Sequence, residues 1–302
     1  MVWDRIDHPD APPVERWGGI TYSLAAAAAA LPVGWSIRPI VKVGRDLAAE
    51  ARAFLGTLPG LEGDAGVEVV DEANNRVHLR YRDRHHRDEH LTGGVPGWGW
   101  DELAPLLEGL DGLFVNLISG FELELDVAER LRAGFGGPVY ADLHSLLLGR
   151  SASGPREPRP LAEPDRWLAA FDVVQVNEQE LALVAGDESP DHVAERAVRH
   201  GLGALLVTRG PAGAAWIAGD DGPFPRRADA APRVRRGEVR VERAWGAGDP
   251  TGCGDVWGAT CFVALMRGER LTAAMAAANR AASANVAHRG ADGLYQHLRA
   301  RA

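Results

Sequence analysis

Apolar and polar positions change their spacing from segment to segment along the chain. From residue 101 onward, short apolar runs typical of buried strands are separated by longer stretches with helical spacing. Strands are expected at 113–118, 138–142, 171–176 and 202–207, and helices at 101–109, 122–134 and 192–200. This βαβ order predicts an α/β fold with a mostly parallel sheet that is covered on both faces by helices.

The N-terminal third has another pattern. Strands are expected at 1–10, 35–43, 67–70, 76–81 and 87–91, and a helix at 44–58. We find no helix between the last three of these strands, so we expect them to pair in an antiparallel sheet.

Polar residues follow several of the expected parallel strands. Asn116, Asp142, Asn177 and Thr208 all fall at strand carboxyl ends. Open parallel sheets bind their ligands beyond that edge. The sequence therefore predicts a ligand site there.

The stretch Asp-Pro-Thr-Gly-Cys-Gly-Asp, residues 249–255, precedes an apolar helix at 256–266. At a helix start the first amides have no intrahelical acceptor, and glycines leave them open to an anion. Asp255, beside such an anion hole, fits a general base that deprotonates an alcohol attacking ATP. The alternative is a glycine-rich turn that Asp255 merely caps. The similar Gly-Ala-Gly-Asp at 246–249 is disfavoured, because Pro250 follows it and the apolar helix starts only after Asp255.

The stretch 249–255 resembles the D-T-x-G-A-G-D motif of the ribokinase-like (PfkB) family of sugar and nucleoside kinases, with Pro250 for a Thr and Cys253 for the usual Ala. The resemblance implies that Asp255 is the catalytic base and that the amides of Gly252, Cys253 and Gly254 form the anion hole. Asp249 resembles the family residue near a monovalent-cation site, so K⁺ dependence, found in some members, is a further expectation.

Other motifs appear in the family's order. Gly18 and Gly19 resemble its G-G-x-x-x-N sugar-binding turn, although Ser23 replaces the Asn. Asp4 falls where the first strand of the family ends in an Asp that binds substrate hydroxyls. Several strand residues normally precede that Asp, so either the start lies upstream or the first strand is trimmed.

The C-terminal motifs imply a nucleotide site. Asn177 and Glu180 resemble the family's N-x-x-E motif, whose Glu places Mg²⁺, usually through water. Cofactor-binding residues implied by these resemblances are Asn177, Glu180, Thr208, Gly210, Gly213 and Asn279. The expected cofactors are ATP and Mg²⁺.

The resemblance also implies a fold. We expect one ribokinase-like domain over 1–302, a three-layer α/β/α sandwich with a small β-sheet lid formed by about 4–17 and 67–95. Such a lid often forms a homodimer contact. Its aromatic residues, Trp98 and Trp100 among them, could stack on a nucleoside base, or they could pack the lid or a dimer interface.

Composition limits the partners. The net charge of −9 and the pI near 5.6 argue against a nucleic-acid or anionic-membrane surface as the main partner. Cys253 and Cys261 form neither a disulfide framework nor a zinc pattern, and no basic-then-apolar leader opens the sequence. We therefore expect a cytoplasmic protein that acts on a small molecule.

Three other functions have less support in the sequence. The H-x-x-E-H sequence at 86–90 resembles a zinc-protease signature but lacks an apolar helical stripe. Neither a P-loop sequence nor an early G-x-G-x-x-G is present, which argues against a P-loop kinase and a nicotinamide dehydrogenase. The leading hypothesis is an ATP-dependent kinase that phosphorylates a hydroxymethyl group of a sugar or nucleoside. The alternative is a catalytically silent sugar or nucleotide sensor with the same fold.

Overall fold

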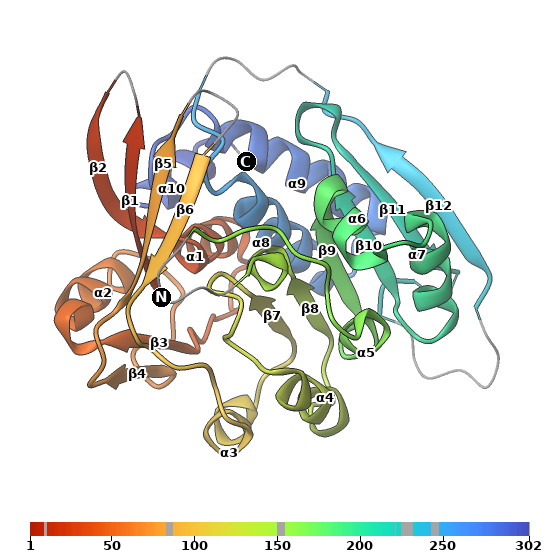
Figure 1. Ribbon diagram of the computed structural model, residues 1–302, viewed down its shortest axis with the longest axis horizontal. Coiled ribbons are helices and arrows are strands. Elements are labelled where there is room, and N and C mark those ends of the chain that lie inside the picture. Colours follow the sequence, from red (N-terminus) through yellow and green to blue (C-terminus); the bar gives the residue numbers. More distant parts are fainter. Residues whose placement is uncertain are drawn as a thin grey trace.

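The computed structural model describes residues 1–8, 11–82, 87–149, 155–220, 222–224, 232–242 and 248–301. A central sheet lies between two layers of helices, and a smaller sheet stands beside them (Figure 1). This arrangement confirms the expected α/β fold with a mostly parallel central sheet.

The central sheet has the strand order β12-β11-β10-β9-β8-β7. Its strands are β7 (Leu113–Asn116), β8 (Val139–Asp142), β9 (Val173–Asn177), β10 (Ala204–Thr208), β11 (Ala214–Gly219) and β12 (Val234–Val239). The strands β7 to β10 pair in parallel, and β11 and β12 add an antiparallel edge. All described residues of β8 are buried, as expected for a strand covered on both faces.

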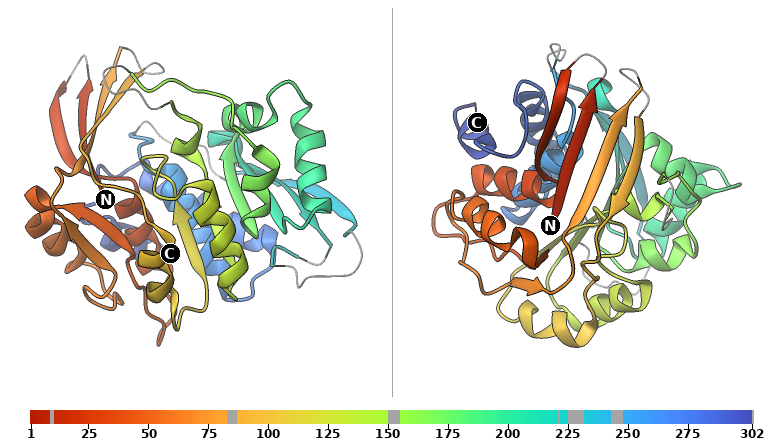
Figure 2. Two further views of the ribbon diagram at one scale, coloured as in Figure 1. Left: turned by 60° about the horizontal axis from the view of Figure 1, so that its bottom comes forward. Right: turned by 60° about the vertical axis from the view of Figure 1, so that its left-hand side comes forward.

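Helices cover both faces of this sheet (Figures 1 and 2). One face carries α4 (Leu125–Gly134), α5 (Pro164–Ala169), α6 (Glu178–Ala185) and α7 (Pro190–Arg199). The other carries α8 (Cys253–Met266) and α9 (Leu271–Asn285), next to α1 (Ile20–Ala30) and α10 (Leu294–Arg299). The apolar runs noted in the sequence thus supply two core layers, one on each side of the sheet.

The smaller sheet has the order β2-β1-β5-β6. Its strands are β1 (Val2–His8), β2 (Ala11–Gly18), β5 (Asn75–Tyr81) and β6 (Arg87–Thr92). β1 pairs parallel with β5, and the other two pairings are antiparallel. We call it the small sheet below.

Three of the expected elements differ in the structure. The strand expected at 67–70, β4 (Val67–Val70), does not join the small sheet but pairs parallel with β3 (Val41–Gly44). The reason is α2 (Ala48–Leu55), which links β3 to β4 as a crossover helix and so makes them parallel. The strand expected at 35–43 is shortened to β3, because Pro39 supplies no backbone N–H to a ladder. The helix expected at 101–109 becomes a single turn, α3 (Trp100–Leu103), followed by a 3₁₀ turn.

Gly44 joins β3 to the small sheet. Its N–H donates to Oδ1 of the fully buried Asn74 at 2.9 Å, and the N–H of Asn74 donates to Asp46 at 2.8 Å. A Cβ at Gly44 would lie 2.2 Å from the backbone nitrogen of Asn74. The backbone at this junction has no room for a side chain.

Gly44→Ala should therefore lower the free energy of unfolding by about 1–3 kcal/mol, the usual cost of overpacking. Urea denaturation measures the change. Gly136→Ala is the matched control, because a Cβ at this exposed glycine meets nothing within 4 Å. Equal stability of the two variants would contradict the close contact.

Candidate active site

A cavity of about 360 Å³ lies at the carboxyl ends of β8, β9 and β10, where α8 begins. The small sheet forms one wall of it through Asp4 of β1 and Glu89 of β6. The candidate residues that line it are Asp4, Gly19, Asn177, Glu180, Thr208, Gly252, Cys253, Gly254 and Asp255. Residues from both ends of the sequence thus meet at the sheet edge where a ligand was expected.

The start of α8 is bare backbone. Its N-cap, Gly252, has φ 77°, and a Cβ there would lie 2.2 Å from the ring of Tyr22. Only glycine can take this left-handed conformation against the ring without strain. The Cys253 N–H already donates to the Pro250 carbonyl at 3.1 Å, so the amides of Gly252 and Gly254 are the more accessible part of the expected anion hole.

Asp255 lies in the first turn of α8 and is held from the sheet. Nδ2 of Asn116, at the end of β7, donates to Asp255 Oδ1 at 2.6 Å and lies 2.9 Å from Ser23 Oγ. The Ser23 hydroxyl in turn lies 3.3 Å from the backbone oxygen of Asp255. Burial raises the pKa of Asp255 to about 6, while the Asn116 hydrogen bond and the charge of His144 pull it down.

A histidine that the sequence reasoning missed lies across the cavity. His144 Nδ1 is 2.6 Å from Oε1 of Glu180, and Asp142 lies beside it at the end of β8. Burial lowers the pKa of His144, but Glu180 and Asp142 outweigh it and raise the pKa to about 9. His144 is therefore a cation at neutral pH. Its one signal in the sequence is its place two residues after a polar strand end.

Asn177 and Glu180 form a reciprocal cap at the start of α6. The Glu180 N–H donates to Asn177 Oδ1 at 2.9 Å, and Glu180 Oε2 accepts from the Asn177 N–H at 2.7 Å. Both carboxylate oxygens of Glu180 thus have protein partners. Such a carboxylate suits a water-mediated contact with Mg²⁺ better than direct coordination.

Gln175 of β9 ties the cavity floor to α8. Its Nε2 donates to Asp142 at 3.0 Å and to the Gly254 carbonyl at 3.1 Å, and its Oε1 accepts from the Tyr140 hydroxyl at 2.8 Å. These bonds fix the helix start relative to the strand ends. Gln175 has no motif around it, and the sequence reasoning missed it.

The Gly18–Gly19 turn meets β1 closely. A Cβ at Gly18 would lie 1.9 Å from Asp4 Oδ2, and one at Gly19 would lie 2.3 Å from the side chain of Ile118. Asp4 is buried, with 7% of its surface exposed. Gly18 thus leaves room for the Asp4 carboxylate at the cavity wall, and Gly19 leaves room for Ile118.

Other candidate residues have different neighbours. Asn279 accepts from Trp257 Nε1 at 2.8 Å and donates to the Val239 carbonyl at 3.1 Å, which joins α9 to α8 and β12. Gly210 and Gly213 form the turn between β10 and β11, outside the lining of the cavity. Trp98 packs under the Lys42 ammonium, and Trp100 packs against Arg130. Both contacts lie within the protein, and neither tryptophan lines the cavity at the start of α8.

Asp249 is part of a buried ion pair. Its Oδ2 lies 2.9 Å from an Arg16 guanidinium nitrogen, and its Oδ1 accepts from the Thr251 N–H at 2.9 Å. The side chains of Arg16 and Asp249 are 9% and 13% exposed. The Asp249 carboxylate is thus already paired with a cationic side chain.

The zinc-protease reading of residues 86–90 does not hold. The signature needs a helix, but Arg87–Thr92 form the strand β6. His86 lies outside the described residues.

The family model described as pfkB family carbohydrate kinase matches residues 150–297. The match covers nearly half of the chain, on its C-terminal side, and agrees with the resemblance that the sequence motifs indicated. The predicted resemblance and the predicted enzyme class, a kinase, are confirmed. A comparison with curated protein sequences gives no match.

Solved structures support the fold. A ribokinase from Thermotoga maritima has a TM-score of 0.72 at 18% identity, covering 99% of this chain and 95% of its own. A Burkholderia thailandensis nucleoside kinase in complex with inosine has a TM-score of 0.71 at 20% identity, covering 99% and 93%. A pyrophosphate-dependent kinase of the ribokinase family has a TM-score of 0.71 at 18% identity, covering 96% and 93%. The predicted ribokinase-like fold is confirmed. Within the part of the chain that the structure describes, the helices are too short or too polar to cross a bilayer.

Asn116→Ala should shift the acid limb of the kcat/KM profile of this kinase to higher pH. The amide hydrogen bond holds down the pKa of Asp255, so its loss raises that pKa. Asn279→Ala is the matched control, since it also removes a buried amide but leaves Asp255 untouched. An unshifted limb in Asn116→Ala would show that Asn116 does not tune the base.

Proposed function

We propose that this kinase transfers the terminal phosphoryl group of ATP to a hydroxymethyl group of a sugar or nucleoside, with Asp255 as the general base. The observation that carries the proposal is the position of Asp255. Its carboxylate stands beside the bare amides of Gly252 and Gly254 and opposite the cationic His144, in one cavity.

The base must be ionised to accept the alcohol proton. The pKa of Asp255, raised to about 6, leaves most of it ionised at pH 7 while keeping it a stronger base than an exposed Asp. The rate should therefore fall as the pH drops through about 6.

Hydrogen-bond donors that are already in position would balance the charge on the transferred phosphoryl group. The amides at the start of α8 donate hydrogen bonds, and the helix dipole adds to them. The His144 imidazolium adds a positive charge to a wall otherwise lined by Asp142, Glu180 and Asp255. A site with so many carboxylates needs that charge to accept a phosphate.

Among the described residues no group of three or more acidic, histidine or cysteine side chains could hold a metal ion, so we propose that this wall contacts Mg²⁺ through water. Glu180 would hold the ion through water, because its own oxygens are engaged with Asn177 and His144. When bound, Mg²⁺ neutralises charge on the phosphate oxygens of the donor. We place Thr208, together with Gly210 and Gly213 of the following turn, on the nucleotide side.

For the acceptor we propose the opposite wall. Asp4 and the Gly18–Gly19 turn would bind its hydroxyls, and Ser23 would act through Asn116 rather than by touching the acceptor. The similar structures include a ribokinase, a nucleoside kinase and a pyrophosphate-dependent kinase. The experiment must therefore vary both the acceptor and the phosphoryl donor.

Asp255→Asn should lower kcat by at least about 10²-fold, since a general base contributes 10²–10⁴-fold. Steady-state kinetics with the best acceptor measures it. Asp126→Asn is the matched control, because Asp126 is also in the first turn of a helix, α4, but exposed and remote from the cavity. A kcat in Asp255→Asn equal to that of the control would remove Asp255 from the mechanism.

The test of the function is a screen of phosphoryl transfer to pentoses, hexoses, ketoses, inositols and nucleosides. ATP and pyrophosphate are each supplied with Mg²⁺, and Asp255→Asn serves as the blank. Turnover of one acceptor that the blank abolishes supports the proposal. Ligand-induced thermal stabilisation without turnover across the panel would instead favour the binding sensor.

We further propose that Arg16 supplies the charge that K⁺ supplies elsewhere in the family. The activity should then change by less than about twofold when K⁺ is replaced by choline at constant ionic strength. Arg16→Met should lower kcat/KM, because it leaves the buried Asp249 carboxylate unpaired next to the loop that starts α8. Strong activation of the unaltered kinase by K⁺ would contradict this role.

A further inference from the structure

The small sheet places a second carboxylate in the candidate site, and the proposed function gives it no role. Glu89 of β6 lines the cavity at the start of α8 together with Asp4, His144 and Asp255. Its side chain is only 12% exposed. In the sequence it is the Glu of the H-x-x-E-H stretch, whose zinc-protease interpretation the strand conformation of β6 excludes. A carboxylate so far removed from water needs partners for its charge and its oxygens.

One oxygen of Glu89 is held by a buried arginine. Arg156 Nη1 donates to Glu89 Oε1 at 3.0 Å, and the Arg156 side chain is 2% exposed. The backbone N–H of Arg156 also donates to the Glu89 carbonyl, at 2.7 Å. The main chain and the side chain of Glu89 are thus both fixed by the same residue.

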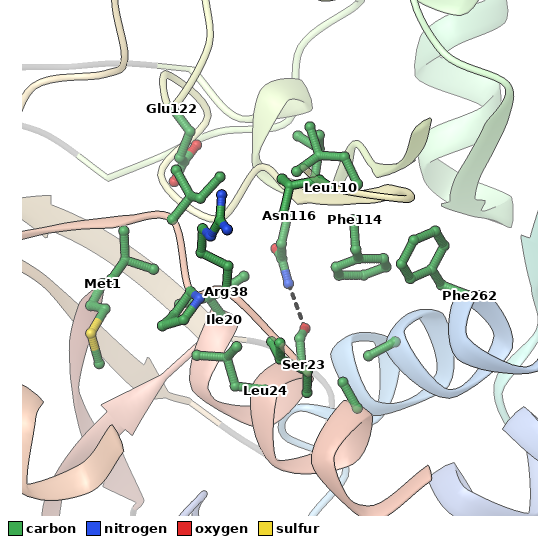
Figure 3. Close-up of a pocket in the computed structure, with 18 of the residues that line it drawn as sticks. Met1, Ile20, Ser23, Leu24, Arg38, Leu110, Phe114, Asn116, Glu122 and Phe262 are labelled. Carbon is green, nitrogen blue, oxygen red and sulfur yellow. Dashed lines mark hydrogen bonds between the residues drawn. The ribbon is translucent and has the colours of Figure 1, made fainter. Parts of the chain in front are cut away.

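Arg156 is anchored in turn to the loops that follow two strands of the central sheet. Its Nη2 donates to the carbonyls of Ser119, after β7, and Ser145, after β8, at 2.9 and 3.0 Å. The loop of Ser119 is itself held by Glu122, whose Oε2 accepts from two of its N–H groups at 2.9 and 3.2 Å. Figure 3 shows Glu122 at the wall of a neighbouring cavity. The position of Glu89 is therefore set by the central sheet as well as by the small sheet.

The other oxygen of Glu89 is open to a ligand. Among the described residues, Glu89 Oε2 has no hydrogen-bond partner. The charge of Glu89 helps to raise the pKa of His144, so the carboxylate lies near that imidazole in the site. An ionised carboxylate oxygen only accepts hydrogen bonds, so its ligand must bring a hydroxyl or another donor.

Asp4 and Glu89 stand on the same face of the small sheet. Asp4 pairs with Val77 of β5. Glu89 pairs with Leu79, two residues further along β5, and all four residues line the cavity. Two strand spacings across the sheet and two residues along it put the Cα atoms of Asp4 and Glu89 about 12 Å apart. Side chains stand roughly perpendicular to a sheet, so the two carboxylates keep about this separation.

This separation and the wall between the carboxylates limit the size and charge of an acceptor. Hydrogen bonds of about 2.7 Å at both ends take up about half of the distance, and the remainder is the width of one hydroxylated ring. Val77 and Leu79, which are buried, offer this ring an apolar surface for its C–H groups. A nucleoside is longer than this span, and an anionic acceptor would meet like charge at both ends.

We propose that Glu89 is a second acceptor-binding residue, positioned by Arg156, and that the acceptor is a neutral polyol with a single ring, a sugar or a cyclitol. Asp4 binds hydroxyls at one edge of the ring and Glu89 binds a hydroxyl at the opposite edge, with the ring against Val77 and Leu79. This role of Glu89 rests on the proposed function, because it takes the cavity at the start of α8 as the acceptor site.

The test measures binding and turnover separately. Thermal stabilisation by ribose, fructose, glucose and myo-inositol is compared with stabilisation by inosine and by glucose 1-phosphate, which keeps the hydroxymethyl group of glucose but is anionic. We expect at least one neutral polyol to stabilise the protein, and neither inosine nor glucose 1-phosphate to do so. Monodeoxy analogues of that polyol identify the hydroxyl at Glu89, since its loss should weaken binding to the unaltered chain but not to Glu89→Ala.

Glu89→Ala should raise the KM of the bound polyol by at least about tenfold, the usual effect of losing a hydrogen bond to a charged group, and change the KM of ATP by less than about twofold. Glu89→Gln keeps the volume of the side chain and should act in the same direction. Asp88→Asn is the matched control, because Asp88 is the preceding residue of β6 but pairs with Arg82 outside the cavity lining.

Arg156→Lys should raise the same polyol KM, because a lysine cannot bind Glu89 and both carbonyls at once. Combined with Glu89→Ala it should add little, since Arg156 acts through Glu89. Fully additive effects, or an equal rise in the KM of ATP, would overturn the positioning role.

A polyol KM in Glu89→Ala equal to that in Asp88→Asn would overturn the role of Glu89 and leave the kinase function intact. Preference for inosine, or binding of none of the four polyols, would overturn the acceptor class. Polyol binding that depends on Glu89, without turnover of any acceptor, would support the role of Glu89 and count against the proposed phosphoryl transfer.

Discussion

The candidate site depends on one hydrogen bond between elements that are far apart in the sequence. The Asn116 amide, from the end of β7, donates to the Asp255 carboxylate in the first turn of α8 at 2.6 Å. Without that bond, burial would raise the pKa of Asp255 further, and the carboxylate would lose its charge near neutral pH. The bond also fixes which carboxylate oxygen is left to face the cavity.

Other contacts in the site hold the start of α8 where this hydrogen bond can form. Gln175 pins the Gly254 carbonyl to β9, Tyr22 leaves room only for glycine at residue 252, and Ser23 bridges Asn116 to the backbone of Asp255. Gln175 comes from β9 and the other two from α1, so the helix start is held from two sides. A preorganised donor set of this kind needs no rearrangement when charge develops.

Many elements of the fold and the start of α8 could be predicted, because they depend on local sequence patterns. The apolar runs of 113–118, 138–142, 171–176 and 202–207 became β7 to β10, and the glycines before α8 marked the helix start. The pairing of 67–70 could not be predicted correctly, because α2 was not recognised as a crossover between β3 and β4. His144 and Gln175 were missed for a related reason. Their importance arises from neighbours 36 residues away, at Glu180, and 79 residues away, at Gly254.

The position of the Asn116 amide depends on β7. Asn116 stands at the end of β7, which is an edge strand among the described residues, and its Oδ1 has no partner. An edge strand is less constrained than a central one. Because the base, Asp255, is held through Asn116 of β7, it is positioned less firmly than it would be by a central strand.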